Sequence, residues 1–430
     1  MPGFYLPSEN EFDPSTDDFV LPFVLKNRKY KHFDLPLREI EREQMIDFSH
    51  EDEPHRFLPL LGYTDVARRY VRNAAGDRVR KIKKRPIRFA GHADAAYLQG
   101  YAAHLNGFYE RALVQDGTSS SVLAYRRGGG TNIHHAKALF DEIRSRGYCT
   151  VVAMDISKFF DRLDHTTLRD EIVGLLGVAR LEGHHATVWK NVTRYSWVET
   201  VDLDKLLGPK RNAHGRVCSP TDFITHVRGR KEGLIRRHNQ SCGIPQGTPV
   251  SGLYANIYLR TFDREMIALC GQHGGSYRRY SDDIAVVLPL DAALDIVDTV
   301  EKILKTFHLD MSVEKTDTAN FKGGQLVSST PIQYLGFTFD GQKTLIRPSS
   351  LDAYRGKMRR GIHAKMIAAK SKKILPSEVF QRESLSRYTH LGKRRNFLRY
   401  AYKAADVMGC PEIRWQVIPE ALSTDLCPST

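Results

Sequence analysis

Three aspartates stand where apolar, strand-like segments end. The run CTVVAMDI contains Asp155, and the pair Asp282 and Asp283 lies between SYRRY and IAVVLP. Such β-branched and apolar runs predict a buried strand ending at Asp155 and a hairpin with its tip at Ser281–Asp282. A single aspartate at such a place is more often a helix N-cap or a turn residue. Carboxylates at corresponding ends of adjacent strands, however, would form a compact set of oxygen ligands for hard divalent cations.

These carboxylates indicate metal-assisted chemistry on phosphate groups. Two Mg²⁺ ions about 4 Å apart can activate a hydroxyl nucleophile and stabilise a pyrophosphate leaving group. Mn²⁺ is an alternative ion for the same oxygen ligands. We therefore expect Asp155, Asp282 and Asp283 to be both metal ligands and catalytic residues.

The segments around the aspartates alternate between helical and strand-like patterns. Apolar residues recur every three to four positions over 92–113, which predicts an amphipathic helix. Further helices are predicted after Asp155 and over 290–307, and strand-like pieces over 311–317 and 333–339. From about residue 350 the chain is helical and basic. This succession predicts an α+β fold.

The composition is that of an ordinary globular protein with excess positive charge. The 430 residues include 64 Lys+Arg and 50 Asp+Glu, a formal net charge of +14, which favours polyanionic partners. The segment at the N-terminus lacks a signal-peptide pattern, and no apolar stretch is long enough to span a bilayer. The six cysteines are scattered, and the adjacent His184–His185 has no nearby cysteine partner for zinc. We expect free thiols, no membrane association and a cytoplasmic location.

Five motifs resemble those of the reverse transcriptase family, in the family's order. MDISKFFDRLDH resembles motif A, GIPQGTPVSGLYANIYL motif B, YSDD motif C, SVEKTD motif D and QYLGF motif E. The resemblance spans roughly residues 80 to 345. It implies a right-hand polymerase with fingers, an antiparallel-sheet palm and a helical thumb.

The resemblance also implies a role for individual residues. Phe160 matches the aromatic steric gate that excludes a 2′-hydroxyl, and Lys315 matches the motif D lysine that assists pyrophosphate departure. Nucleotide-binding roles fall on Phe160, Gln246, Gly247, Arg126 and Arg127, and on Tyr280, which would pack near the primer end. Gly247 would let backbone approach the substrate closely, and Lys84 and Arg85 are weaker candidates for phosphate contact. Core packing, a plain turn and solvated surface cations are the competing interpretations of these residues.

The domain organisation follows from the motif positions. We expect an N-terminal extension over 1–60, fingers and palm over 61–347 with the motifs at about 151–340, and a helical basic thumb over 348–430. The basic insert at 205–240 is assigned to the fingers or to RNA contact. The expected partners are an RNA template, an RNA–DNA duplex product and dNTPs.

The motif style is closest to prokaryotic stand-alone reverse transcriptases, of which the defence-associated enzymes come first and retrons second. No retron-like Val-Thr-Gly element is found, and motif B has Ser251-Gly252 where retrons usually have Ser-Pro. A dedicated structured non-coding RNA is therefore the expected template, and antiphage defence the expected role. Two alternatives stay open: an RNA-dependent RNA polymerase that reads the ribose through Asp161, and a polymerase-like protein that binds RNA without catalysis. Template identity, priming mode, product and oligomeric state are not readable from the sequence.

Overall fold

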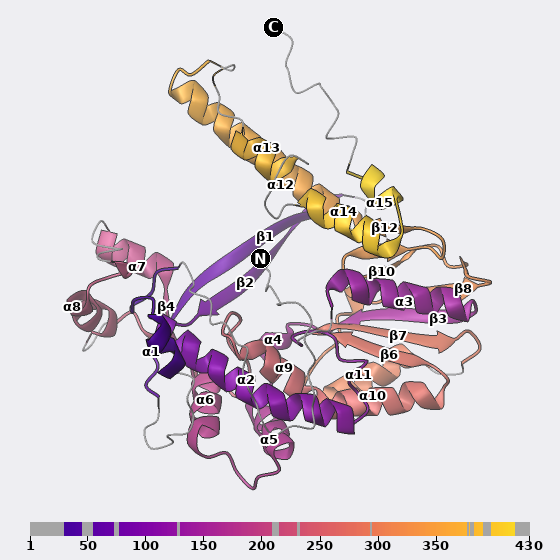
Figure 1. The fold of residues 1–430 in the computed structure, drawn as a ribbon, viewed down its shortest axis with the longest axis horizontal. Helices are drawn as coiled ribbons and strands as arrows, with labels where there is room; N and C mark the ends of the chain where they lie inside the picture. Colours follow the sequence, from indigo (N-terminus) through magenta and orange to yellow (C-terminus); the bar gives the residue numbers. More distant parts are fainter. Residues whose placement is uncertain are drawn as a thin grey trace.

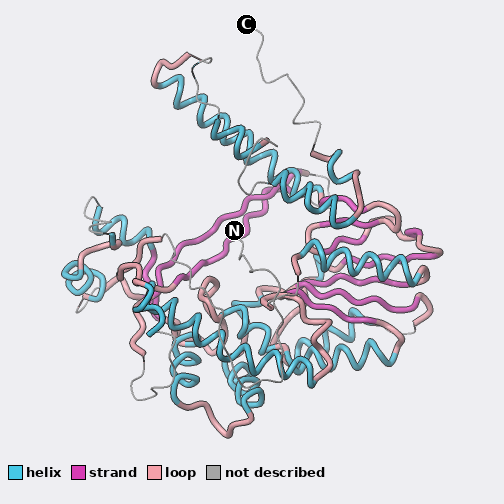
Figure 2. The backbone as a smooth tube through the Cα atoms, in the orientation of Figure 1, coloured by secondary structure: helices cyan, strands magenta, loops and turns pink. Residues whose placement is uncertain are grey.

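The computed structural model describes residues 30–44, 55–72, 77–126, 130–208, 215–229, 233–292, 295–375, 378, 382–389 and 397–417. The chain forms a central sheet, a long hairpin arm and a projecting helical arm (Figures 1 and 2). The α+β fold class expected from the sequence is confirmed. Among the described residues, no helix has the length and apolar character that crossing a membrane requires.

The central sheet is antiparallel, and its strand order is β6-β7-β3-β8-β9. Its strands are β6 (Ser276–Tyr280), β7 (Asp283–Pro289), β3 (Cys149–Asp155), β8 (Asp317–Lys322) and β9 (Gln325–Leu326). Buried apolar residues of β3 and β7 form the middle of this sheet. This is the expected palm sheet.

Helices cover both faces of the palm sheet, with α3 on one face and α10 and α11 on the other (Figure 1). These helices are α3 (Asn132–Arg146), α10 (Arg260–Gln272) and α11 (Ile296–Thr306). Because side chains alternate along a strand, Val151 and Val287 pack in the apolar cluster of α3, whereas Val152 and Val286 pack in that of α10 and α11. Burial on both faces explains why these strands are almost continuously apolar.

A long antiparallel hairpin, β1 (Leu60–Arg72) with β2 (Arg78–Phe89), reaches toward the helical arm (Figure 1). We call it the β1–β2 arm. Its base pairs in parallel with β4 (Ser196–Glu199), which in turn pairs with β5 (Arg236–Arg237). The outer side carries α7 (Thr200–Leu207), α8 (Pro220–Asp222) and the π-helical turn η3 (Phe223–Arg228). Phe33 packs into the same apolar cluster as Leu61 and Val198, so this part of the predicted N-terminal extension packs against β1 and β4.

A layer of helices supports the palm and the base of the β1–β2 arm. It comprises α1 (Glu39–Gln44), α2 (His92–Gln115), α4 (Phe159–Arg162), α5 (His165–Leu176), α6 (Gly183–Thr193) and α9 (Ser251–Tyr258). The predicted amphipathic helix over 92–113 is α2, and one apolar cluster joins α2, α5 and α9 to the palm.

The C-terminal part begins with a small antiparallel sheet and continues in helices. The strands are β10 (Ile332–Tyr334), β11 (Phe337–Phe339) and β12 (Thr344–Ile346), and the helices are α12 (Pro348–Ser371), α13 (Arg382–Tyr388), α14 (Phe397–Met408) and α15 (Glu412–Trp415). The helical, basic character predicted after residue 350 is confirmed. The strand predicted over 311–317 is wrong: the short 3₁₀ turn η4 (Val313–Lys315) occupies it, and β8 begins only at Asp317.

Candidate active site

The three aspartates converge at one end of the palm sheet. Asp155, the last residue of β3, lies directly opposite Asp283, the first residue of β7. Asp282 lies in the turn between β6 and β7, and its carbonyl accepts a hydrogen bond of 3.0 Å from the Ile156 amide. Because directly opposite residues of an antiparallel pair have neighbouring Cβ atoms, sheet register brings the carboxylates together. The predicted hairpin tip at Ser281–Asp282 lies at this position.

Crowding of like charges perturbs these carboxylates. Burial, together with the neighbouring Asp282 and Asp155, raises the pKa of Asp283 to about 7. Burial and Asp155 also raise the pKa of Asp282. Three oxygen ligands whose negative charges repel one another at a half-buried site suit a hard divalent cation, which would neutralise them. The residues present therefore fit the expected Mg²⁺ ions, and their role as ligands stays a prediction.

Lys315 pairs with the same cluster. Its ammonium group forms an ion pair with the Asp155 carboxylate, and its side chain is exposed. The η4 turn positions it: the Lys315 amide donates to the Ser312 carbonyl at 2.9 Å, and the Ser312 amide donates to the Asp155 carbonyl at 2.7 Å. The motif D lysine and the motif A aspartate are therefore neighbours, which is the placement that the predicted role requires.

Lys83 on β2 is a further cation beside the aspartates, and sequence reasoning missed it. Partial burial, Arg85 and Lys315 lower the pKa of Lys83, whereas Asp155 and Asp282 raise it, so its ammonium group senses this cluster. Side chains alternate along a strand, so Lys83 and Arg85 share one face of β2 and Lys84 lies on the other. The alternation of side chains along the basic segment 78–88 would therefore have separated Lys83 from Lys84, the candidate named from the sequence.

Phe160 lies on α4, beside the hairpin tip. It is half-buried, and its ring centroid lies 5.6 Å from that of Phe159 and 6.5 Å from that of Tyr125. Tyr125 Oη in turn lies 3.1 Å from Ser281 Oγ, and both residues have positive φ angles, of 60° and 62°. A non-glycine residue in this left-handed region is uncommon and marks a constrained site. Tyr125 is thus a second aromatic residue near the aspartates, and no motif singled it out.

Gln246 and Gly247 connect the site to the β1–β2 arm. Gln246 Nε2 donates to Asp161 Oδ1 at 3.2 Å, and the Gln246 carbonyl accepts from the Arg88 amide at 2.8 Å. Gly247 has φ +124°, and a Cβ there would lie 2.6 Å from the Arg88 carbonyl oxygen. Close packing against β2 therefore requires this glycine. The expected reason, approach of the backbone to substrate, is not needed to explain it.

Tyr280, the last residue of β6, is half-buried, and its ring centroid lies 5.8 Å from that of His135 on α3. The neighbouring Arg279 is fully buried and pairs with Asp263 of α10 at 2.6 Å. Arg279 also donates to the Ser281 carbonyl at 3.1 Å, so it holds the hairpin tip that carries Asp282.

Arg126 has a different environment from the one expected. Its guanidinium group pairs with Glu110 at 2.6 Å and donates to the Val122 carbonyl at 3.0 Å. These contacts tie the turn after α2 together, so in this conformation Arg126 has a structural role rather than a free phosphate-gripping one. Arg127, the other expected triphosphate contact, lies outside the described residues.

Comparison with known proteins supports the family predicted from the motifs. Residues 196–339 match the family described as reverse transcriptase (RNA-dependent DNA polymerase), a segment that contains Gln246, the Asp282–Asp283 turn and Lys315. The match supports the prediction of an RNA-directed DNA polymerase, a nucleotidyltransferase. Asp155 precedes the matched segment. No curated protein matches the chain.

Several solved polymerase structures are similar in part. Truncated apo telomerase from Candida Tropicalis is 12% identical with a TM-score of 0.40, and covers 67% of this chain and 55% of its own. Telomerase from Candida albicans in complex with a fragment of telomeric RNA is 12% identical with a TM-score of 0.41, and covers 87% and 65%. The RNA-dependent RNA polymerase of a human picorbirnavirus is 14% identical with a TM-score of 0.36, and covers 66% and 43%. The chain thus spans less than two thirds of the length of these structures.

Proposed function

We propose that this protein is a reverse transcriptase that copies an RNA template into DNA. One observation carries the proposal: Asp155 lies opposite Asp283 and beside Asp282, with the cations of Lys315 and Lys83 next to them. Carboxylates that hold divalent cations, faced by cations that hold phosphates, are what nucleotidyl transfer to a primer 3′-hydroxyl requires. The family match over 196–339 supports this reaction class.

In this proposal, two Mg²⁺ ions, or Mn²⁺ in their place, would be held by Asp155, Asp282 and Asp283. When bound, such ions make the 3′-hydroxyl more acidic and neutralise charge that develops on the pyrophosphate. Lys83 and Arg85 would bind the triphosphate through charge-assisted hydrogen bonds. Lys315 would leave Asp155 once cations neutralise that carboxylate, and its ammonium group could then donate a proton to the departing pyrophosphate.

Selection of dNTPs over NTPs is assigned to Phe160. Its ring is fixed between Phe159 and Tyr125 beside the hairpin tip, so it offers a firm surface on which a deoxyribose can lie. Replacing Phe160 with valine should open space for a 2′-hydroxyl and raise the use of NTPs relative to dNTPs. Equal discrimination by the Phe160→Val variant and the parent would remove Phe160 from this role.

Two basic elements are suited to hold template and product. Helix α12 has a single acidic residue and many basic ones, of which Arg355, Lys357, Arg359, Arg360, Lys365 and Lys370 are examples. The β1–β2 arm reaches toward the helical arm that contains α12 (Figure 1), and its β2 strand is also strongly basic. Phosphate contacts of this kind hold a duplex without reading its sequence. An RNA–DNA duplex between α12 and the arm is therefore the proposed product complex.

The proposed biological role is antiphage defence with a dedicated structured non-coding RNA as template, in the cytoplasm. It rests on the motif style, including Ser251-Gly252. Gly252 has a local reason as well, because a Cβ there would lie 2.7 Å from the Tyr125 ring. A retron-type enzyme that makes RNA-linked single-stranded DNA is the second candidate. Survival of phage-infected cells that carry the parent gene or the Asp282→Ala/Asp283→Ala variant would test the defence role.

The polymerase proposal is tested by purification of the full chain from cells, sequencing of bound nucleic acid, and addition of labelled dNTPs or NTPs with Mg²⁺. Asp282→Ala/Asp283→Ala is the inactive variant, and Asp170→Ala, an exposed aspartate on α5, is the matched control. Incorporation of dNTPs by the parent and the control alone supports the proposal. Incorporation of NTPs alone would favour an RNA polymerase. Binding of a specific RNA with no incorporation on any supplied primer would favour the non-catalytic RNA-binding alternative.

A further inference from the structure

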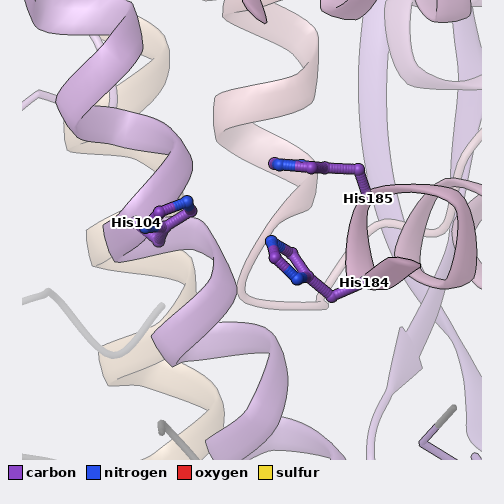
Figure 3. A group of neighbouring side chains, drawn as sticks. All are labelled: His104, His184 and His185. Atoms are coloured by element: carbon purple, nitrogen blue, oxygen red, sulfur yellow. The ribbon is translucent and has the colours of Figure 1, made fainter. Parts of the chain in front are cut away.

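Three histidines lie together between α2 and α6, on elements that carry none of the predicted active-site residues. His104 belongs to α2, and His184 and His185 to the first turn of α6. One nitrogen of each lies within 4.8 Å of those of the other two. Figure 3 shows the three rings extending from the two helices toward a shared space. Ring centroids lie 4.3 Å apart for the adjacent pair, and 5.6 and 6.0 Å from that of His104.

We propose that His104, His184 and His185 bind a divalent transition-metal cation of the Zn²⁺ class. The donor set is three imidazole nitrogens, which suit zinc, copper and nickel, whereas Mg²⁺ prefers oxygen ligands. This site would therefore select a different cation from the aspartate cluster, and it does not depend on the polymerase proposal. Three protein ligands leave a fourth position for water or another small ligand.

The geometry is close to what such a cation needs. Nitrogen ligands of one tetrahedral zinc ion lie about 3.4 Å apart at ordinary Zn–N distances. The observed upper limit of 4.8 Å means that no pair of nitrogens must approach by more than roughly 1.4 Å. All three histidines are half-buried, so rotation of side chains can supply this movement and an ion can still enter from solvent.

A hydrogen-bonded pair of tyrosines lies behind His185. Tyr101 Oη is fully buried and lies 3.1 Å from His185 Nδ1, and Tyr254 Oη donates to Tyr101 Oη at 3.3 Å. A metal-bound histidine usually donates its second ring N–H to such an outer group, which fixes the ring orientation. Tyr101 Oη can accept this hydrogen bond, and Nε2 of His185 is then the nitrogen that binds the cation.

A cation here would join the two helices that flank the base of the β1–β2 arm. α2 follows β2 after two residues, and α6 leads into β4, which pairs with β1. A bond from His104 to His184 and His185 would therefore restrain the base of the arm that carries Lys83. We expect a structural role, seen as higher resistance to unfolding.

The test uses the full-length chain, stripped with a chelator and titrated with Zn²⁺ against a chromogenic competitor in excess Mg²⁺. We expect the parent to bind one Zn²⁺ per chain and to unfold at a higher temperature when Zn²⁺ is bound. The affinity for Zn²⁺ should be at least about tenfold lower in His104→Ala and in His184→Ala, as for loss of groups that support a metal. His226→Ala, at an exposed histidine of η3, and Asp282→Ala/Asp283→Ala should bind as the parent does. X-ray absorption at the zinc edge of the loaded parent should show imidazole nitrogens.

Three results would overturn the proposal. The first is that the parent binds no stoichiometric Zn²⁺. The second is that Zn²⁺ binding is lost in Asp282→Ala/Asp283→Ala but kept in His104→Ala, which would assign the ion to the aspartate cluster. The third is a zinc-edge spectrum that shows oxygen or sulfur ligands only. Because the zinc-edge spectrum is measured on the parent, it decides the question even where a histidine variant does not fold.

Discussion

Arg279 and Asp263 form a fully buried ion pair whose loss should disturb the active site without touching substrate. Two hydrogen bonds join them, Nε to Oδ1 at 2.7 Å and Nη2 to Oδ2 at 2.6 Å. Arg279 Nη1 donates in addition to the Ser281 carbonyl at 3.1 Å and to Asn256 Oδ1 at 3.2 Å. The pair therefore links α10 to the turn that holds Asp282, and it serves both stability and position.

The two functions can be separated by comparing a single and a double variant. Arg279→Met leaves the Asp263 carboxylate buried without its cation, which should lower the free energy of unfolding by about 3–5 kcal/mol. Arg279→Met/Asp263→Leu removes both charges, so that penalty is absent. Both variants leave Asn256 Oδ1 and the Ser281 carbonyl without a donor, and the double variant also leaves the Tyr277 hydroxyl without its acceptor, at about 1 kcal/mol each. The double variant should thus lose about 3 kcal/mol in total, and it should be about 2–4 kcal/mol more stable than Arg279→Met.

Two quantities are measured on the same preparations: the free energy of unfolding in urea and the rate of dNTP incorporation. The free energies are comparable if their slope against urea concentration is the same for all variants. We expect the double variant to recover stability but not activity, because the Ser281 carbonyl has still lost its donor. Arg260→Met/Asp116→Leu is the matched control: this pair also anchors α10, at 2.6 Å, but makes no contact with the hairpin tip. A double variant less stable than Arg279→Met, or activity that returns together with stability, would refute the reasoning.

Three further predictions concern single side chains. Lys83→Ala should lower kcat/KM for dNTPs by about 10- to 100-fold, as expected for loss of a charge-assisted contact. Lys84→Ala, on the other face of β2, should change kcat/KM less than about twofold. Equal effects of the two variants in steady-state kinetics would contradict the assignment of Lys83. Gly247→Ala should lower the free energy of unfolding in urea by about 2 kcal/mol, because the new Cβ meets the Arg88 carbonyl and the φ angle is strained. The control, Gly271→Ala, lies at a helical position with open space and should raise the free energy of unfolding by about 0.5–1 kcal/mol. Burial lowers the pKa of His32 from 6.5 to about 4, so between these pH values the unfolded chain binds more protons than the folded one. The free energy of unfolding should therefore fall by about 3 kcal/mol from this group as the pH drops from 6.5 to 4. In His32→Gln the free energy of unfolding should fall less steeply with pH, and parallel pH profiles of the variant and the parent would show that His32 does not contribute.

The arrangement of the aspartates was readable from the sequence because local pattern and sheet geometry agree there. β-branched, apolar strands that end at Asp155 and flank Asp282–Asp283 fix both the strands and the turn. The strand predicted over 311–317 failed because a local turn, closed by the Lys315 amide on the Ser312 carbonyl, outweighs the short apolar pattern. That turn is also what aims Lys315 at Asp155.

Other features depend on contacts between segments far apart in the chain. Arg126 looked like a phosphate ligand because its partner, Glu110, lies 16 residues earlier on α2. Gly247 is required by Arg88 of β2, a contact that no turn pattern reveals. His184–His185 lacked a cysteine for a zinc site, yet His104, 80 residues earlier, supplies a third imidazole once α2 and α6 pack together. In each case the residue type was visible and its partner was not.

The two halves of the candidate site are fixed by different kinds of contact. Asp155 and Asp283 are set by the register of two core strands, and a slip of one residue would turn every core side chain to the wrong face. Lys83 instead lies in the β1–β2 arm, which is joined at its base through β4 and through the Arg88–Gln246 hydrogen bond. Movement of the arm would therefore change the proposed contact of Lys83 with a triphosphate while the carboxylates keep their geometry. Restraint at the arm's base, by the Arg88–Gln246 contact or by a cation on the three histidines, should then alter dNTP binding before it alters metal binding at the aspartates.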